Sequence, residues 1–193
     1  GRRPVAAGAL ALGLAITAGQ LQFVIYGLAL FSLYGMGRIL QGPREHRPAD
    51  LKAGLGIVGF GLALGALHLL PTYLLATDTI RPPFDWEALR QTGLPWRQLI
   101  TLLAPWFMGR PEDGSYRGAQ NASELMAYAG LIPLCGGLLA LVLRRDGLSR
   151  LFTGLAFGVL AIALATPLAW PLAHLPWLQR FGLMRWLAFW PLF

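Results

Sequence analysis

The sequence predicts an all-α fold, a polytopic bundle of transmembrane helices. Of its 193 residues, 55% are hydrophobic and 13% are charged, whereas soluble domains carry about 25% charged residues. Its apolar runs approach the roughly 20 residues that a helix needs to cross a bilayer. The net charge of +7 could also indicate nucleic-acid binding, but Arg and Lys fall in the gaps between apolar runs rather than on one soluble face. We therefore expect membrane lipids, and no nucleic acid, as partners.

The first two segments follow the N-terminus. Residues 1–20 imitate a signal peptide, with a basic start and a short apolar run. However, Ile16 would occupy the −3 position for cleavage after Ala18, and further apolar segments follow. We therefore expect a truncated first helix over about 4–18. A second helix is expected over about 21–40, before the linker QGPREHRPAD.

The third expected helix covers about 51–76, with a kink at Pro71 near its far end. A long polar stretch, 77–123, separates it from the later segments. Both ends of the chain look cut within apolar runs, so 1–193 is expected to be one partial transmembrane domain from the middle of a longer protein. The remaining membrane segments, which bring the total to about six, are expected at about 124–143, 151–168 and from 184 onward.

Basic residues in the short loops all fall on one side of the predicted bundle. The positive-inside rule makes that side cytoplasmic, and long loops count little in the rule. The loops 77–123 and 169–183 are therefore expected outside, and the Arg/Leu/Gly-rich composition is typical of a bacterial inner membrane. The cations that set this orientation are Arg2, Arg3, Arg38, Arg44, Arg47, Lys52, Arg144, Arg145 and Arg150.

The long outer loop is predicted to carry a helix that lies in the membrane interface. Pro95 suits a first helical turn, and Trp86, Trp96 and Trp106 have amphipathic rings that are favoured at the headgroup level. The alternative is a soluble loop helix that packs on its own domain. The apolar stripe of this helix would consist of Trp96, Leu99, Ile100, Leu102 and Leu103.

Two patterns that imitate functional motifs favour packing. The run GLGIVG at 54–59 satisfies G-x-G-x-x-G, but the dinucleotide motif needs a preceding strand, whereas this run lies within an apolar helix, where small residues allow close helix packing. His68 has no second His or carboxylate at metal-ligand spacing, which favours a hydrogen-bonded packing role over a ligand or relay.

The boundary of the fourth segment carries the polar run NASE. Asn121 and Ser123 form a glycosylation acceptor, which matters only in a eukaryotic secretory setting. Ser123 is expected instead to cap the fourth helix, with Glu124 in its first turn, where the helix dipole favours a negative charge.

Charged residues on the outward side are the functional candidates. A carboxylate can act as a general base on a hydroxyl within its reach, and arginine can pair with a lipid phosphate through its planar fork. Arg185, near the outer end of the sixth segment, is expected to snorkel outward or face a polar cavity. The set comprises Arg81, Glu112, Asp113, Arg117, Glu124 and Arg185.

Five stretches, taken together and in order, resemble the YfhO-like bacterial membrane proteins. AGQLQFVIY resembles a turn before a Gln-containing helix start, and LPWRQLITLLAPWFMG resembles an outer-loop helix that ends in Pro and a Phe-x-Gly-like turn. ELMAYAGLIPL resembles the start Glu-x-x-x-Tyr-x-Gly-Leu-x-Pro-Leu. The other two are ALHLLPTYLLATDTIR, which ends at Arg81, and ALATPLAWPLAHLPWLQRFGLMR, which ends at Arg185.

The resemblance implies a membrane glycosyltransferase of the GT-C class, which passes a sugar from a polyprenyl-phosphate carrier to an acceptor on the outer face. It adds a reason to expect that Glu124 faces a site, and we hypothesise catalytic roles for Glu124 and for the outward-facing Asp113, which would orient the acceptor or bind a cation. The substrate-binding residues that it implies are Arg81, Arg185, Tyr128 and Gln22. No cofactor is certain, although a divalent cation could bind at the carboxylates.

Two departures bear on these roles. The chain has Gly19-Gln20-Leu21-Gln22 where the family often has Gly-His-Pro-Gln, and Arg180 and Arg185 match a family arginine pair only loosely. The catalytic base of the class usually lies in a first outer loop, which would precede residue 1. The alternative is a non-catalytic membrane module, either a lipid transporter or an assembly scaffold. The sequence disfavours an ion channel, because it contains no repeated filter motif or ring of charge.

Overall fold

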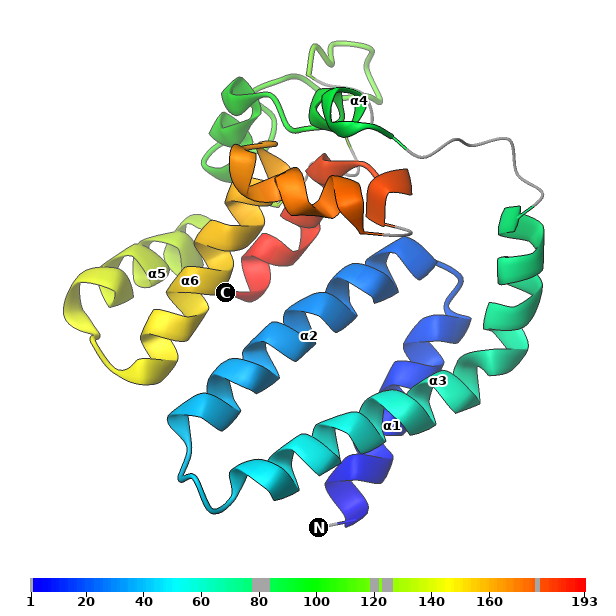
Figure 1. Cartoon of the computed structure of the whole chain (residues 1–193). Coiled ribbons are helices and arrows are strands. Elements are labelled where there is room, and N and C mark those ends of the chain that lie inside the picture. The colour runs from blue at the N-terminus through cyan, green and yellow to red at the C-terminus, as the bar shows by residue number, and fades with distance from the viewer. Residues whose placement is uncertain (1, 78–83, 119–121, 123–126, 176–177) are drawn as a thin grey trace. The chain divides into compact units, whose positions relative to one another are not determined.

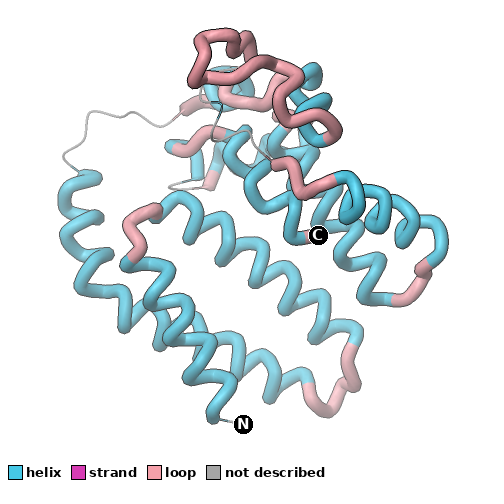
Figure 2. The backbone as a smooth tube through the Cα atoms, turned by 180° about the vertical axis from the view of Figure 1, so that it is seen from behind, coloured by secondary structure: helices cyan, strands magenta, loops and turns pink. Residues whose placement is uncertain are grey.

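The computed structural model describes residues 2–77, 84–118, 122, 127–175 and 178–193. Every regular element in these ranges is a helix, so the predicted all-α class is confirmed. Figure 1 traces the helices along the chain, and Figure 2, from behind, shows that most loop residues belong to the segment between α4 and α5. The chain forms two compact units, Gly1–Arg81 and Pro82–Phe193, which are described one at a time.

The first unit contains α1 (Arg2–Thr17), α2 (Leu21–Gln41) and α3 (Arg47–Thr77). The predicted second helix is confirmed almost to the residue, and the third begins four residues earlier than predicted. The turn between α1 and α2 contains Gly19 with φ 86°, a conformation that a residue without Cβ adopts at little cost. The chain thus runs up, down and up again, with α1 beside α3 and parallel to it (Figure 1).

Glycines allow α1 and α3 to pack closely. A Cβ at Gly61 would lie 2.6 Å from Leu12 Cδ2, and a Cβ at Gly65 would lie 2.6 Å from Ile16 Cγ2. Ile16 is completely buried by this packing.

The run 54–59 lies inside α3 with no strand before it, so it lacks the context of a nucleotide loop. Of its three glycines only Gly56 approaches α1, because a Cβ there would lie 3.3 Å from Val5, whereas Gly54 and Gly59 meet nothing within 4 Å.

Two helices are long and apolar enough to cross a membrane, α2 and the part of α3 from Arg47 to Leu75. At 1.5 Å per residue, the 21 residues of α2 span about 31 Å, which matches a hydrocarbon core of about 30 Å. Only 11% of the most apolar window of each helix is buried within the protein. The apolar faces of both helices are therefore available to lipid, and the chain is a membrane protein by this criterion.

The last third of α3 contains Pro71, and Figure 1 shows the helix bending in this region. Proline has no amide hydrogen to donate to the carbonyl of Leu67, so the helix loses one bond there. One residue further along, Thr72 Oγ1 donates to the carbonyl oxygen of His68 at 2.7 Å. The predicted kink thus has its expected cause, and the backbone of His68 takes part in a local hydrogen bond.

The second unit is built from short helices around one small core. Leu89, Ala169 and Leu183 are buried together, with Phe84 and Trp86 among the residues packed against them. They come from different elements, which brings separate parts of the sequence together. The elements are α4 (Trp86–Gln91), η1 (Trp96–Leu102), α5 (Leu131–Leu143), α6 (Gly147–Ala163) and the 3₁₀-helices η3 (Pro167–His174), η4 (Leu178–Arg180) and η5 (Leu183–Leu192).

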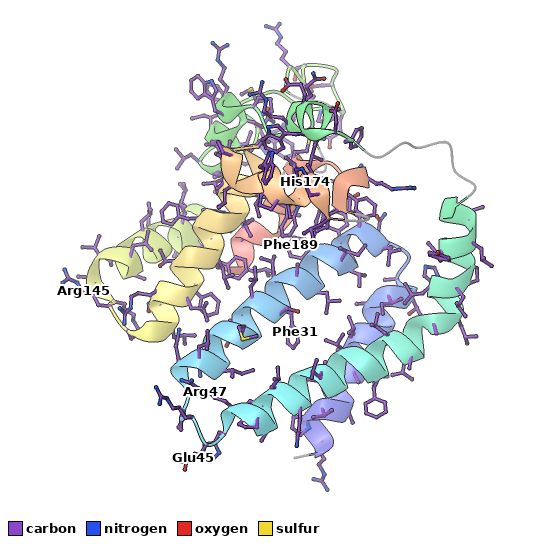
Figure 3. All side chains as sticks on the ribbon, viewed as in Figure 1. Phe31, Glu45, Arg47, Arg145, His174 and Phe189 are labelled. Atoms are coloured by element: carbon purple, nitrogen blue, oxygen red, sulfur yellow. The ribbon has the colours of Figure 1, made fainter. Side chains whose placement is uncertain are left out.

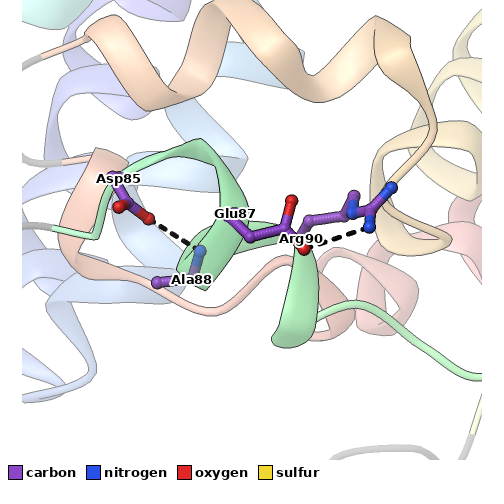
Figure 4. A network of polar contacts seen from close by, with 4 residues as sticks. All are labelled: Asp85, Glu87, Ala88 and Arg90. Atoms are coloured by element: carbon purple, nitrogen blue, oxygen red, sulfur yellow. Dashed lines mark hydrogen bonds and ion pairs between the residues drawn. The ribbon is translucent and has the colours of Figure 1, made fainter.

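Aspartate caps begin two of these helices. Asp85 accepts a hydrogen bond from the amide of Ala88 at 2.8 Å, and Glu87 pairs with Arg90 at 3.0 Å one turn along α4 (Figure 4). Asp146 caps α6 in the same way, because its Oδ1 accepts from the amide of Ser149 at 3.0 Å. Each cap satisfies an amide that has no partner within the helix.

The fourth helix begins later than predicted, at Leu131 rather than at 124. Its N-cap is Gly130, with φ 103°, so the prediction that Ser123 caps this helix is wrong. Pro133 explains the difference, because a helix that began upstream would need its missing amide and would place its ring against the carbonyl of Ala129. At 13 residues α5 is about 20 Å long, which is too short to cross a bilayer alone.

The fifth and sixth segments also differ from the prediction. Helix α6 ends at Ala163, and η3 continues at an angle of 75° to it, so the two form one broken span or a re-entrant element. The sixth segment is a 3₁₀-helix, η5, with Pro191 near its end. Two spans, or three with the bent pair, are thus supported, and a six-span bundle is not confirmed.

Candidate functional site

Asp113 lies in an exposed loop that closes where the amide of Arg117 donates to the carbonyl of Met108 at 2.8 Å. Asp113 Oδ1 accepts from the amide of Ser115 at 2.9 Å. Ser115 Oγ in turn accepts from the amide of Arg110 at 3.0 Å. These bonds give Asp113 a structural role, which is to hold the tip of the loop.

The surroundings of Asp113 favour its charged form. Hydrogen bonds from the Ser115 side chain and backbone lower the pKa of this carboxyl, and the positive charge of Arg110 adds to the effect. A carboxylate with a lowered pKa is a weaker proton acceptor than an ordinary aspartate. Asp113 is therefore better suited to orienting an acceptor or binding a cation than to removing a proton.

The other predicted site residues fall in three places. Glu124 and Arg81 lie outside the described residues. Glu112 and Arg117 are exposed on the same loop as Asp113. Tyr128, with 40% of its surface exposed, precedes α5 without belonging to it.

Gln22 and Arg185 lie in different units. Gln22 is buried at the start of α2, and its Nε2 donates to the hydroxyl oxygen of Tyr26 at 2.8 Å. Arg185 is half-buried in η5. The convergence of the predicted residues on one site stays a prediction.

A second feature of the segment 96–110 is a set of exposed aromatic and basic side chains, which we call the loop surface. Its apolar members are all well exposed: Trp96 72%, Leu103 53%, Trp106 43% and Phe107 66%. Two guanidinium groups lie over its indole rings: Arg97 Cζ is 5.6 Å from the Trp96 ring centroid, and Arg110 Cζ is 4.8 Å from that of Trp106. Such contacts are cation–π interactions.

One side of η1 is buried within the second unit and is polar. Gln98 and Thr101 are buried, and residues three apart share one face of a 3₁₀-helix. Gln98 Nε2 donates to the Tyr116 hydroxyl at 3.2 Å, while Thr101 Oγ1 donates to the Gln98 carbonyl at 2.7 Å.

Of the predicted apolar stripe, Trp96 and Leu103 are exposed, whereas Leu99, Ile100 and Leu102 are half-buried. The interfacial position of the segment therefore stays a prediction, as does the alternative of a soluble loop helix.

The cation–π pairs were not foreseen from the sequence. Adjacent Trp and Arg in PWRQ give a weak signal for the first pair, whereas the second joins Trp106 to Arg110 through a turn that the sequence does not predict. The buried Gln98 was likewise hidden, because a lone Gln among apolar residues carries no signal of its own.

Within the described residues, no group of three or more His, Cys, Asp or Glu side chains could hold a metal ion. A divalent cation at the carboxylates therefore stays a prediction. Comparison of the chain with protein-family models, with curated proteins and with solved structures finds no match.

Proposed function

We propose that the chain is part of a membrane glycosyltransferase that moves a sugar from a polyprenyl-phosphate donor to an acceptor outside the cytoplasm. The observation that carries the proposal is the loop surface, where Arg97 and Arg110 sit over exposed indole rings beside Leu103 and Phe107. Apolar side chains suit the lipid part of such a donor, and guanidinium groups suit its phosphate.

The proposed reaction assigns roles to the predicted residues. Glu124 orients the acceptor hydroxyl or binds a cation. The hydroxyl gives its proton to a carboxylate base in an outer loop as its oxygen attacks the anomeric carbon and the bond to the carrier phosphate breaks. Arg81 and Arg185 neutralise the departing polyprenyl phosphate, and Asp113 orients the acceptor or binds a cation. Tyr128 and Gln22 contact the substrate. The proposal includes six membrane segments, a bacterial inner-membrane location and an extracytoplasmic loop at 77–123.

A non-catalytic membrane module, either a lipid transporter or an assembly scaffold, is the second candidate. The hydrogen bonds from Ser115 to Asp113 favour it, because they occupy the carboxylate locally and lower its pKa. In this case the loop surface would still bind lipid, but no sugar would be released from a donor.

Sugar transfer from a radiolabelled polyprenyl-phosphate hexose separates the two candidates. The proposal predicts that the protein in proteoliposomes converts the donor to polyprenyl phosphate. Replacing both loop arginines, Arg97→Gln with Arg110→Gln, should raise KM for the donor by at least about tenfold, since even a single charge-assisted contact contributes about 1.5–3 kcal/mol.

Arg90→Gln is the matched control, because Arg90 belongs to the same unit but pairs with Glu87 rather than with a ring. It should leave KM unchanged. Glu124→Gln should abolish turnover with donor binding intact. A parent protein that consumes no donor would contradict the enzyme and favour the non-catalytic module.

A further inference from the structure

Within the described residues of the three-helix unit, the charged residues all lie at one end (Figure 1). Residues 4–37 and 53–77 contain no Asp, Glu, Lys or Arg. Val5 of α1 lies 3.3 Å from the position of a Cβ on Gly56, so the start of α1 lies beside the first turns of α3. The turn between α2 and α3 is at the same end (Figure 1). The cations gathered there, which we call the basic end, are Arg3, Arg38, Arg44, Arg47 and Lys52.

Most of these cations are available to a ligand. Arg3, Arg38, Arg44 and Lys52 are exposed, and none of them forms an ion pair within the described part of the chain. The two carboxylates of this end, Glu45 and Asp50, do not neutralise them. Glu45 instead lies 3.9 Å from His46, with both side chains mostly in solvent.

Arg47 ties the basic end together, as Figure 3 shows at the turn between α2 and α3. Its Nη2 donates to the carbonyl of Leu40 at 2.7 Å, which satisfies a free carbonyl in the last turn of α2. Its Nε is buried with no hydrogen-bond partner among the described residues. Arg47 thus fixes the turn between α2 and α3.

We propose that the basic end binds the headgroups of anionic phospholipids. Helices α2 and α3 are the two candidate spans, so their shared turn lies at the bilayer surface, at the height of the lipid phosphates. Each Lys or Arg close to an anionic membrane surface adds to the electrostatic attraction between the protein and the lipid headgroups. The described residues at the opposite end of this unit, at 17–21 and 75–77, carry no formal charge.

The test uses the full chain reconstituted in phosphatidylcholine bilayers that contain traces of spin-labelled lipid. Paramagnetic resonance then gives the relative association of labelled phosphatidylglycerol and phosphatidylcholine with the protein surface. The parent should prefer phosphatidylglycerol. The variant Arg44→Gln with Lys52→Gln should reduce that preference by at least about twofold. Salt at about 0.5 M shortens the Debye length to about 3–5 Å and should therefore reduce the parent's preference as well.

Two variants at the same end control for charge and fold. Glu45→Gln with Asp50→Asn, which removes carboxylates in place of cations, should raise the preference. Arg44→Lys with Lys52→Arg should retain it. The proposal is overturned if the parent shows no preference, if the double glutamine variant keeps it with unchanged helicity, or if removal of the carboxylates lowers it as much as removal of the cations. Sugar transfer does not enter these outcomes, so they are independent of the proposed function.

Discussion

At the scale of single residues, Thr92 joins parts of the second unit that are far apart in sequence. Its Oγ1 donates to the carbonyl of Leu89 at 2.6 Å and accepts from the amide of Leu183 at 2.9 Å. Its own carbonyl accepts from the amide of Met184 at 3.1 Å. Next to it, the amide of Leu94 donates to the carbonyl of Ala163 at 2.7 Å, where α6 ends. Thr92 therefore connects the end of α4 to the start of η5.

Thr92→Val should lower the free energy of unfolding by about 1–3 kcal/mol, because the half-buried amide of Leu183 loses its acceptor. Thr92→Ser keeps the hydroxyl and should restore most of the loss. Thermal unfolding in detergent measures both. A valine variant as stable as the parent would show that this hydrogen bond contributes nothing.

Asp146 gives a residue-scale prediction about pH. Hydrogen bonds from Ser149 lower the pKa of its carboxyl, so its stabilisation of α6 is present above the ordinary pKa of aspartate and is lost as pH falls through the lower value. Asp146→Ala should therefore lower the melting temperature at neutral pH. The difference from the parent should shrink as pH falls below about 4. A difference that does not depend on pH would contradict the cap.

At the scale of elements, the packing of α1 against α3 depends on glycine. Gly61→Ala should lower the free energy of unfolding by about 1–3 kcal/mol, because the new methyl group would overlap Leu12 and push the helices apart. Gly59→Ala is the matched control in the same helix, since a Cβ there meets nothing within 4 Å. It should be neutral or stabilising by up to about 1 kcal/mol. Unfolding in sodium dodecyl sulfate titrations compares them, and equal effects would rule out close packing as the reason for Gly61.

The same scale shows where sequence patterns suffice. Helices α2 and α3 were predicted well because long apolar runs end at charged turns, and membrane crossing depends on such composition. The start of α5 was predicted too early because the apolar run from 125 onward hid two local signals, Gly130 and Pro133. The break after α6 depends on Ala165, whose φ is 53°, and on Pro167. A count of apolar residues does not detect either of these local features.

At the scale of the whole molecule, function was less predictable than fold. Charge and aromatic content in the outer loop predicted an interfacial segment, but they could not reveal that Gln98 would be buried or that Arg110 would lie over Trp106. Such contacts join residues through loop geometry rather than through periodicity. The convergence of Asp113, Arg185 and the other predicted residues depends in the same way on tertiary placement, which no spacing in the sequence specifies.

We predict that α3 carries the chain across the membrane, so that the turn at 42–46 and the loop surface face opposite sides of it. Single cysteines in a Cys135→Ser background test it, with Glu45→Cys in the turn and Glu112→Cys in the outer loop, both of which are exposed. An impermeant maleimide applied to intact spheroplasts should label Glu112→Cys at once, and Glu45→Cys only after the membrane is permeabilised. Labelling of both positions from the same side would contradict the account.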